Sequence, residues 1–157
     1  MKKTSVAICL ALIIAAPSYA ANAAPNTPKV GDCFFVSPEE LDSPNPISNK
    51  ISCSFTHNLE TYFVGKVSGS TDPNKQSEKV LLNRVKQTCL NAWKFPETSP
   101  LNYFAFYVPT SAQWKAGSRW LRCDGGIASE SSESDLPELG TWKGSAVNSR
   151  GNVTQLS

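Results

Sequence analysis

The sharpest candidate for chemistry is His57, which lies four residues after Cys53 and three before Glu60 and is the only histidine in the chain. A histidine can serve as a general acid or base near neutral pH, or as a metal ligand. A metal site needs three or four ligands, and hydrolysis needs a nucleophile or an activated water beside the base. The neighbouring sequence matches no motif that supplies them. We therefore expect His57 and Glu60 to fix a loop by hydrogen bonding, with ligand contact and catalysis as the alternatives.

Cysteine is the second residue type that could do chemistry. Cys9 lies in the apolar N-terminal run, and an even number of cysteines follows it: Cys33, Cys53, Cys89 and Cys123. Their spacing contains no C-x-x-C pair, so we predict disulfides and no metal site. Of the three possible pairings we favour Cys33 with Cys53 and Cys89 with Cys123, because each bridge then joins neighbouring segments. A catalytic cysteine would have to stay unpaired, with His57 as its base.

The first 20 residues have the pattern of a signal peptide. Two lysines precede an apolar run from Val6 to Ala16, and small residues lead up to Ala20. A run of about a dozen residues is too short for a bilayer that needs roughly 20. We expect cleavage after Ala20, with Ala23 as the other option, and therefore a secreted chain in an oxidising compartment with no membrane insertion after cleavage.

Charge argues against two classes of partner. Removing Lys2 and Lys3 with the leader leaves 13 basic residues against 13 acidic residues. A balanced chain without a basic run lacks the electrostatic footprint of a nucleic-acid binder or of a protein bound to an anionic membrane. We predict neither partner and no cofactor.

The periodicity of the remaining chain predicts an α+β fold, with a small antiparallel sheet, one main helix packed on it and two disulfides. The helix is expected from Asp72-Pro73 through Lys94, with Cys89 on its buried face. The predicted strands are Val30–Val36, Ile51–Phe55, Glu60–Val67, Tyr103–Val108 and Trp120–Cys123, with a weaker edge strand near Leu139–Trp142.

These elements suggest four regions along the chain. Residues 1–20 are the signal peptide, 21–29 a flexible spacer, 30–126 the disulfide-stapled domain and 127–157 a polar, largely disordered tail. The tail is assigned from its serine-rich and acidic stretch, which offers little apolar surface to bury.

Three clusters of the domain resemble the septum-formation domain of secreted and membrane-anchored actinobacterial proteins. They are Gly31-Asp32-Cys33-Phe34, the C-x-x-x-H-x-x-E run from Cys53 to Glu60, and Trp114-x-x-Gly117-x-Arg119 before Cys123. The resemblance covers about Val30 to Cys123 and includes a helix that carries a cysteine. It departs at Trp120-Leu121-Arg122, where the family more often has a short aliphatic run. The resemblance implies a setting at the cell envelope and no established chemistry.

Structural roles are expected for most residues of these clusters. Asp32 should accept backbone N–H groups in the turn before its strand. Trp114, Gly117 and Arg119 suggest a tight turn, with the arginine pairing with Glu60 or Asp32. A set of strand aromatics would fall on both sheet faces and could form a binding platform if one face were left uncovered: Tyr62, Tyr103, Phe104, Phe106, Tyr107 and Trp120.

Together these observations predict a non-enzymatic extracytoplasmic binding or scaffold domain at the bacterial envelope. Its expected partner is an envelope protein or a cell-wall component, with a possible link to septum formation. The alternatives are a small secreted hydrolase using His57 and Glu60, and a secreted inhibitor or effector presenting the Cys33–Cys53 loop.

Overall fold

The computed structural model describes residues 27–41, 50–129 and 138–156. Its strands are β1 (Cys33–Phe34), β2 (Lys50–Ile51), β3 (Leu59–Lys66), β4 (Tyr103–Tyr107), β5 (Trp120–Ala128) and β6 (Leu139–Gly140). Its helices are α1 (Pro38–Leu41), α2 (Glu78–Ala92) and α3 (Ser111–Lys115), with a 3₁₀ turn at Pro73–Lys75. The predicted signal peptide lies outside the described residues, as does most of the predicted spacer.

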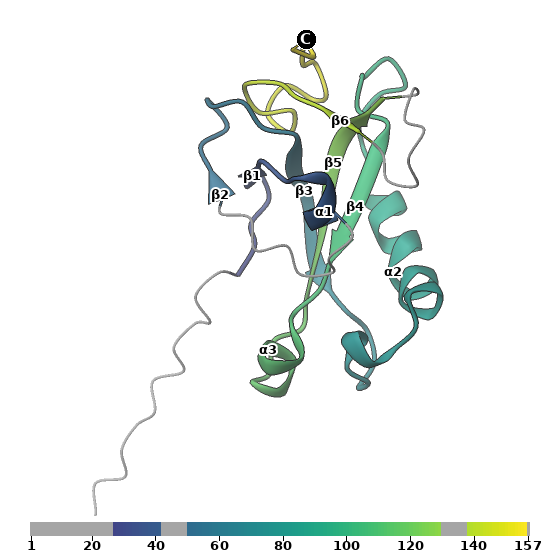
Figure 1. Cartoon of the computed structure of the whole chain (residues 1–157). Helices are drawn as coiled ribbons and strands as arrows, with labels where there is room; N and C mark the ends of the chain where they lie inside the picture. Colours follow the sequence, from purple (N-terminus) through teal and green to yellow (C-terminus); the bar gives the residue numbers. More distant parts are fainter. Residues whose placement is uncertain (1–26, 42–49, 130–137, 157) are drawn as a thin grey trace, which may run out of the picture.

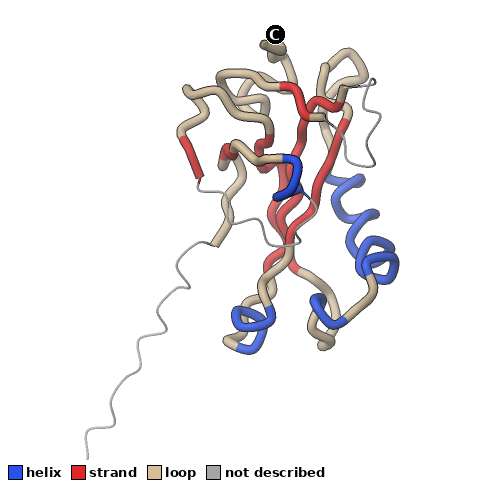
Figure 2. The backbone as a smooth tube through the Cα atoms, in the orientation of Figure 1, coloured by secondary structure: helices blue, strands red, loops and turns tan. Residues whose placement is uncertain are grey.

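The predicted α+β class is confirmed. All strand pairs are antiparallel, and the sheet has the order β2-β1-β3-β5-β4, with β6 added beside β5. The three long strands β3, β5 and β4 run side by side through the length of the molecule, and α2 packs alongside them (Figure 1). In the tube view the helices lie around the periphery of this strand layer (Figure 2).

The main helix begins later than the predicted entry at Asp72-Pro73, because α2 starts at Glu78 after its N-cap Ser77. Asp72 accepts a hydrogen bond from the backbone N–H of Asn74, and Pro73 opens the 3₁₀ turn before α2. Leu81, Val85 and Cys89 recur at four-residue steps and are the buried residues of α2. Val80, which precedes Leu81 in the helix, is exposed.

Side-chain alternation divides the core between the two faces of the sheet. Phe104 and Phe106 of β4 pack on the same side as α2, against a cluster that contains both sulfurs of the second disulfide. Tyr107 and Ala105 pack on the opposite face with Phe34, Val36 and Leu59. The six strand aromatics considered above are buried or half-buried in these two clusters, and none of them is fully exposed.

The C-terminal residues 138–156 differ from the predicted disordered tail. Trp142 is fully buried in a third cluster with Leu101, Ile127 and Ala146. β6 also extends β5 through the pairs Ile127 with Gly140 and Ala128 with Leu139. The ordered unit therefore continues past residue 126, because one tryptophan and a few small apolar residues are enough to anchor a polar segment. Residues 130–137 lie outside the description.

Two short helices were not predicted. The breaker-rich stretch after Val36 contains α1, and the polar turn between β4 and β5 contains α3. Ser37 and Glu40 exchange reciprocal side-chain bonds at the start of α1, and Thr110 and Gln113 do so at α3. Both are capping boxes, which stabilise a helical turn too short to show periodicity. Within the described residues, no helix has the length and apolar character needed to span a bilayer.

Candidate functional site

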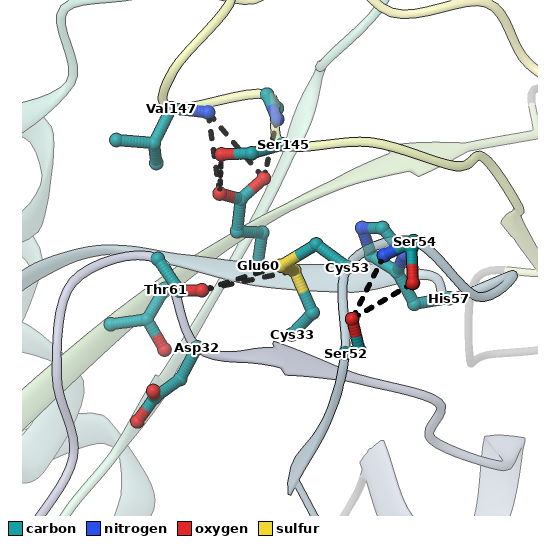
Figure 3. Close-up of a disulfide and its surroundings, with 12 residues drawn as sticks. Asp32, Cys33, Ser52, Cys53, Ser54, His57, Glu60, Thr61, Ser145 and Val147 are labelled. Atoms are coloured by element: carbon teal, nitrogen blue, oxygen red, sulfur yellow. Dashed lines mark hydrogen bonds between the residues drawn. A yellow bond between two sulfur atoms is a disulfide. The ribbon is translucent and has the colours of Figure 1, made fainter.

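The two disulfides form as favoured from the sequence. Cys33 and Cys53 are joined with their Cα atoms 5.3 Å apart, and Cys89 and Cys123 with theirs 5.7 Å apart. The first bridge ties β1 to the turn after β2 (Figure 3), and the second pins the buried face of α2 to β5. All four sulfurs are thus engaged within the fold.

His57 lies beside the first disulfide, and its ring has a structural environment. Its Nδ1 lies 2.8 Å from the carbonyl oxygen of Phe55. A carbonyl can only accept, so Nδ1 donates the proton of this hydrogen bond, and Nε2 is buried with no hydrogen-bond partner among the described residues. The ring packs edge-on against Trp142 at 4.7 Å between centroids. Two backbone hydrogen bonds also join His57 and Trp142, so this residue anchors the C-terminal segment.

A possible metal-ligand set includes the same histidine. Ligand atoms of Cys33, Cys53 and His57 lie within 4.8 Å of one another. The two sulfurs are bonded to each other, however, and zinc binds the thiolate form of cysteine. As folded here, this set offers one nitrogen and no thiolate.

Glu60 is buried and is bonded to the C-terminal segment. Its carboxylate accepts hydrogen bonds from the Ser145 hydroxyl and from the backbone amides of Ala146 and Val147 (Figure 3). Each carboxylate oxygen thus has partners in the 145–147 turn, while the His57 ring is bonded to Phe55 and stacked on Trp142. The two residues fix loops by hydrogen bonding and packing, and they do so on different partners.

Asp32 is bonded within its own turn. One carboxylate oxygen accepts the backbone N–H of Lys29 at 2.8 Å, and the other lies 3.2 Å from the ammonium of Lys50. The Lys50 side chain is more than half exposed, so the ion pair contributes little to stability. The aspartate thereby organises the turn that leads into β1.

The pairing predicted for Arg119 is wrong. Its guanidinium lies 3.8 Å above the ring of Trp114 and donates to the carbonyl oxygens of Trp114 and Ser118. Glu60 and Asp32 have other partners, so the arginine closes the turn locally instead of reaching across the domain. Cation–π stacking, the Trp114 carbonyl in the last turn of α3 and the Ser118 carbonyl together satisfy its charge.

The predicted tight turn at Trp114-x-x-Gly117 is the end of α3. Gly117 has φ of +98°, and its amide bonds to the Trp114 carbonyl while the Ser118 amide bonds to that of Gln113. This pair of bonds is a Schellman motif, which places glycine in the left-handed region.

Replacing Gly117 by Ala should lower the free energy of unfolding by about 1 kcal/mol, because alanine is strained at this φ. An added Cβ would meet no atom within 4 Å, so the loss isolates the backbone effect. Urea unfolding checks this, with Gly117→Asn as the matched variant, because asparagine tolerates the left-handed region. Equal losses for the two variants would contradict the backbone explanation.

A buried ion pair on the face of the sheet away from α2 was missed from the sequence. Arg122 and Asp124 of β5 approach to 2.9 Å, with side chains 9% and 0% exposed. Thr61 Oγ1 donates to the other oxygen of Asp124 at 2.8 Å. The guanidinium lies between the rings of Phe34 and Tyr107, about 4 Å from each. Asp124-Gly125-Gly126 was predicted to end the strand, but β5 continues to Ala128.

The two glycines explain that wrong boundary. A Cβ at Gly126 would come within 3.1 Å of the Asn58 carbonyl and of Leu59, and one at Gly125 would contact Trp93, Phe95 and Tyr62. The glycines therefore serve close packing inside a strand and do not form a turn. The sequence does contain a signal for this pair. Leu121 and Cys123 alternate with Arg122 and Asp124, so in a strand the two charged residues must share one face of the sheet.

The described residues also form a groove of about 360 Å³ along β4, the outer strand of the sheet. β4 lines it from Tyr103 to Phe106, Leu41 of α1 borders it on one side, and Leu81 and Leu82 of α2 border it on the other. Polar residues of the 73–78 segment complete the lining. The groove is mostly apolar, and it lies across the sheet from the His57 region.

Comparisons with known proteins returned nothing for this chain: it matches no family model, no curated protein and no solved structure.

Proposed function

We propose that this chain is a non-enzymatic, extracytoplasmic binding domain of the bacterial cell envelope, with an envelope protein or a cell-wall component as its partner. A role linked to septum formation rests on the resemblance of three motif clusters alone. The observation that carries the binding function is the apolar groove beside β4.

The covalent framework supports the compartment. Two disulfides join described segments, and such bonds persist in oxidising environments outside the cytoplasm. They agree with the signal-peptide pattern of residues 1–20.

The hydrogen bonds and burial of His57 and Glu60 support a binding role over hydrolysis. Glu60 receives three donors from the 145–147 turn, and His57 is fully buried under Trp142. A general base must reach the proton that it removes, and a carboxylate saturated by structural donors has little remaining capacity to do so. The alternative of a hydrolase using His57 and Glu60 is therefore less well supported than binding.

The groove offers what a binding site needs. It is concave and mainly apolar, with a few polar groups at one end, which is the usual make-up of a ligand site. Its rim includes half-buried leucine and aromatic side chains that a partner could cover.

A pull-down from envelope extract tests the proposal through one groove variant and a matched control. Leu82→Lys places a charge in the groove, whereas Leu90→Lys places the same charge on an exposed position of the same helix outside the groove lining. We expect wild type and the Leu90 variant to retain a common partner, and the Leu82 variant to retain at least tenfold less. Retention that is equal in all three proteins would contradict the groove as the binding surface.

A further inference from the structure

The hydrogen-bond pattern of the sheet leaves part of β4 unpaired. Val67 donates its backbone N–H to the Arg119 carbonyl at 2.8 Å, one step beyond the Lys66–Trp120 pair. Within an antiparallel strand, the backbone N–H and C=O groups of successive residues point alternately to the two neighbouring strands. The odd-numbered residues of β5 therefore bond to β3, and the even-numbered residues bond to β4. Tyr103, Ala105 and Tyr107, which pair with Gly126, Asp124 and Arg122, therefore direct their backbone groups to β5.

It follows that Phe104 and Phe106 direct their backbone N–H and C=O groups away from β5, toward the outer edge of the sheet. Among the described strands, none pairs with this edge, and the backbone hydrogen bonds outside the strands do not involve either residue. An open edge of this kind is a template for another extended chain. The other described strands with a single neighbour, β2 and β6, have only two residues each, whereas β4 has five.

The groove coincides with this open edge. Its lining includes Tyr103–Phe106, among them the two residues whose backbone groups point away from β5. Leu81 packs in the same cluster as the Phe104 and Phe106 side chains, Leu82 follows it in α2 and also lines the groove, and Leu41 belongs to the cluster on the other face. A strand added here would thus find apolar surface on both of its faces.

The charge of the groove restricts the kind of segment that could bind in it. Among the described residues that line the groove, Glu78 is the only charged one. It lies at the start of α2, where Asn74 and Gln76 are also part of the lining. A cationic side chain at the corresponding end of a bound segment would face this carboxylate.

We propose that the groove binds an extended peptide, which adds to β4 as a further strand. The segment spans about five residues, matching β4. The peptide residues opposite Phe104 and Phe106 carry apolar side chains against Leu81 and Leu82, and a lysine or arginine faces Glu78. Backbone bonds supply affinity and the alternate side chains supply selectivity, as in other cases of strand addition. This inference rests on the proposed binding function and identifies its partner as an unfolded or extended protein segment.

A phage-displayed library of random linear nonapeptides, selected on the exported, disulfide-bonded chain, tests the inference. We expect enrichment of peptides that alternate apolar residues and carry a basic residue near one end. Glu78→Lys should weaken binding of the selected peptide at least tenfold, while Glu97→Lys, which makes the same charge change at an exposed position outside the groove lining, should leave it unchanged.

Backbone pairing is tested directly on the best selected peptide. Hydrogen exchange of the Phe104 and Phe106 amides should slow at least tenfold on saturation, because both donors become bonded. In an added strand, every second backbone N–H group of the peptide points toward β4. N-methylation of the odd-numbered or of the even-numbered peptide residues should therefore abolish binding in one case and leave it in the other.

The outcomes separate this inference from the function on which it rests. Groove binding by peptides that leave the Phe104 and Phe106 amides unprotected, or that tolerate methylation in both registers, would overturn strand addition and leave the binding function in place. A library without enriched binders would overturn the peptide as partner, and retention of another component in the pull-down would still support the binding function. Concentration-dependent dimerisation lost in Leu82→Lys would show that a second copy fills the edge, which also overturns the inference.

Discussion

Replacing both Cys89 and Cys123 by alanine should lower the free energy of unfolding by about 4 kcal/mol. The bridge closes a loop with a sequence separation of 34 residues, and in the chain-entropy model a loop of that length restricts the unfolded state by this amount. It also connects the two main layers, because Cys89 lies on the buried face of α2 and Cys123 on β5. The loss is a large fraction of the 5 to 15 kcal/mol that is typical of a domain.

Denaturant unfolding followed by far-UV circular dichroism would measure the change. The Cys33→Ala, Cys53→Ala variant is the matched comparison, and we expect a smaller loss of about 3 kcal/mol from its shorter loop. Alkylation of the exported protein without reductant should modify no thiol. A chain whose four cysteines are all alkylated in the native state would show that neither bridge forms in the cell.

Replacing Asp124 by alanine should lower the free energy of unfolding by about 3 to 5 kcal/mol, because it leaves the Arg122 guanidinium buried without its counter-ion. The pair lies within the sheet, with Thr61 bonded to the carboxylate and two aromatic rings enclosing the guanidinium. Removing one charge from such an arrangement costs more than removing both.

The double variant Arg122→Met, Asp124→Leu is the control for that explanation. It should be more stable than the Asp124→Ala variant, because neither charge remains to be buried unpaired. Denaturant unfolding of wild type, Arg122→Met, Asp124→Leu and the double variant completes a mutant cycle. Additive losses would show that the two residues do not act as a pair.

Burial raises the pKa of the Asp124 carboxyl above its ordinary value of 3.8, and the opposing effects of Arg122 and Thr61 offset this only in part. A raised folded-state pKa means that the native protein binds the proton more tightly than the unfolded chain does. The contribution of Asp124 to stability is therefore greatest at low pH and is lost as pH rises through the folded-state pKa. The negative charge of Asp32 also raises the pKa of Asp124. The Tyr107 ring packs against the Arg122 guanidinium and is another titratable group beside this pair.

A comparison of wild type with Asp124→Asn between pH 3 and pH 8 would isolate this effect, because asparagine does not titrate. We expect the stability difference, wild type minus variant, to decrease as pH rises from about the unfolded-state value of 3.9. A difference that increases with pH over this range would show that Arg122 dominates and that the pKa is lowered.

Several elements of the fold could be read from local pattern. Of the three possible disulfide pairings, the one favoured for joining neighbouring segments is the one that forms, and α2 follows from an apolar residue every three or four positions, although it starts at Glu78 and not at Asp72-Pro73. The long strands β3 and β4 follow from their β-branched and aromatic residues. These features depend on residues that are close in sequence, or on a chemistry that only cysteine has.

The features missed depend on residues that are distant in sequence. Glu60 finds its donors in the turn at Ser145, 85 residues away, and Thr61 bonds to Asp124 across two strands. Gly125 and Gly126 look like a turn in the sequence, and only the packing of Tyr62, Trp93 and Leu59 against them shows why a strand needs them. The short helices α1 and α3 depend on capping bonds, which periodicity does not reveal.

Residue types and spacing were thus sufficient for the α+β class and for the expectation of two disulfides, because side-chain periodicity and thiol pairing act over short stretches of chain. The order of the strands in the sheet decided which edge is open and which charged residues are buried. That order makes β4 an outer strand with unpaired backbone groups, and it brings Arg122 and Asp124 to a covered face of the sheet. Strand order results from contacts closed over long loops, whose free energies depend on the whole fold and leave no local pattern in the sequence.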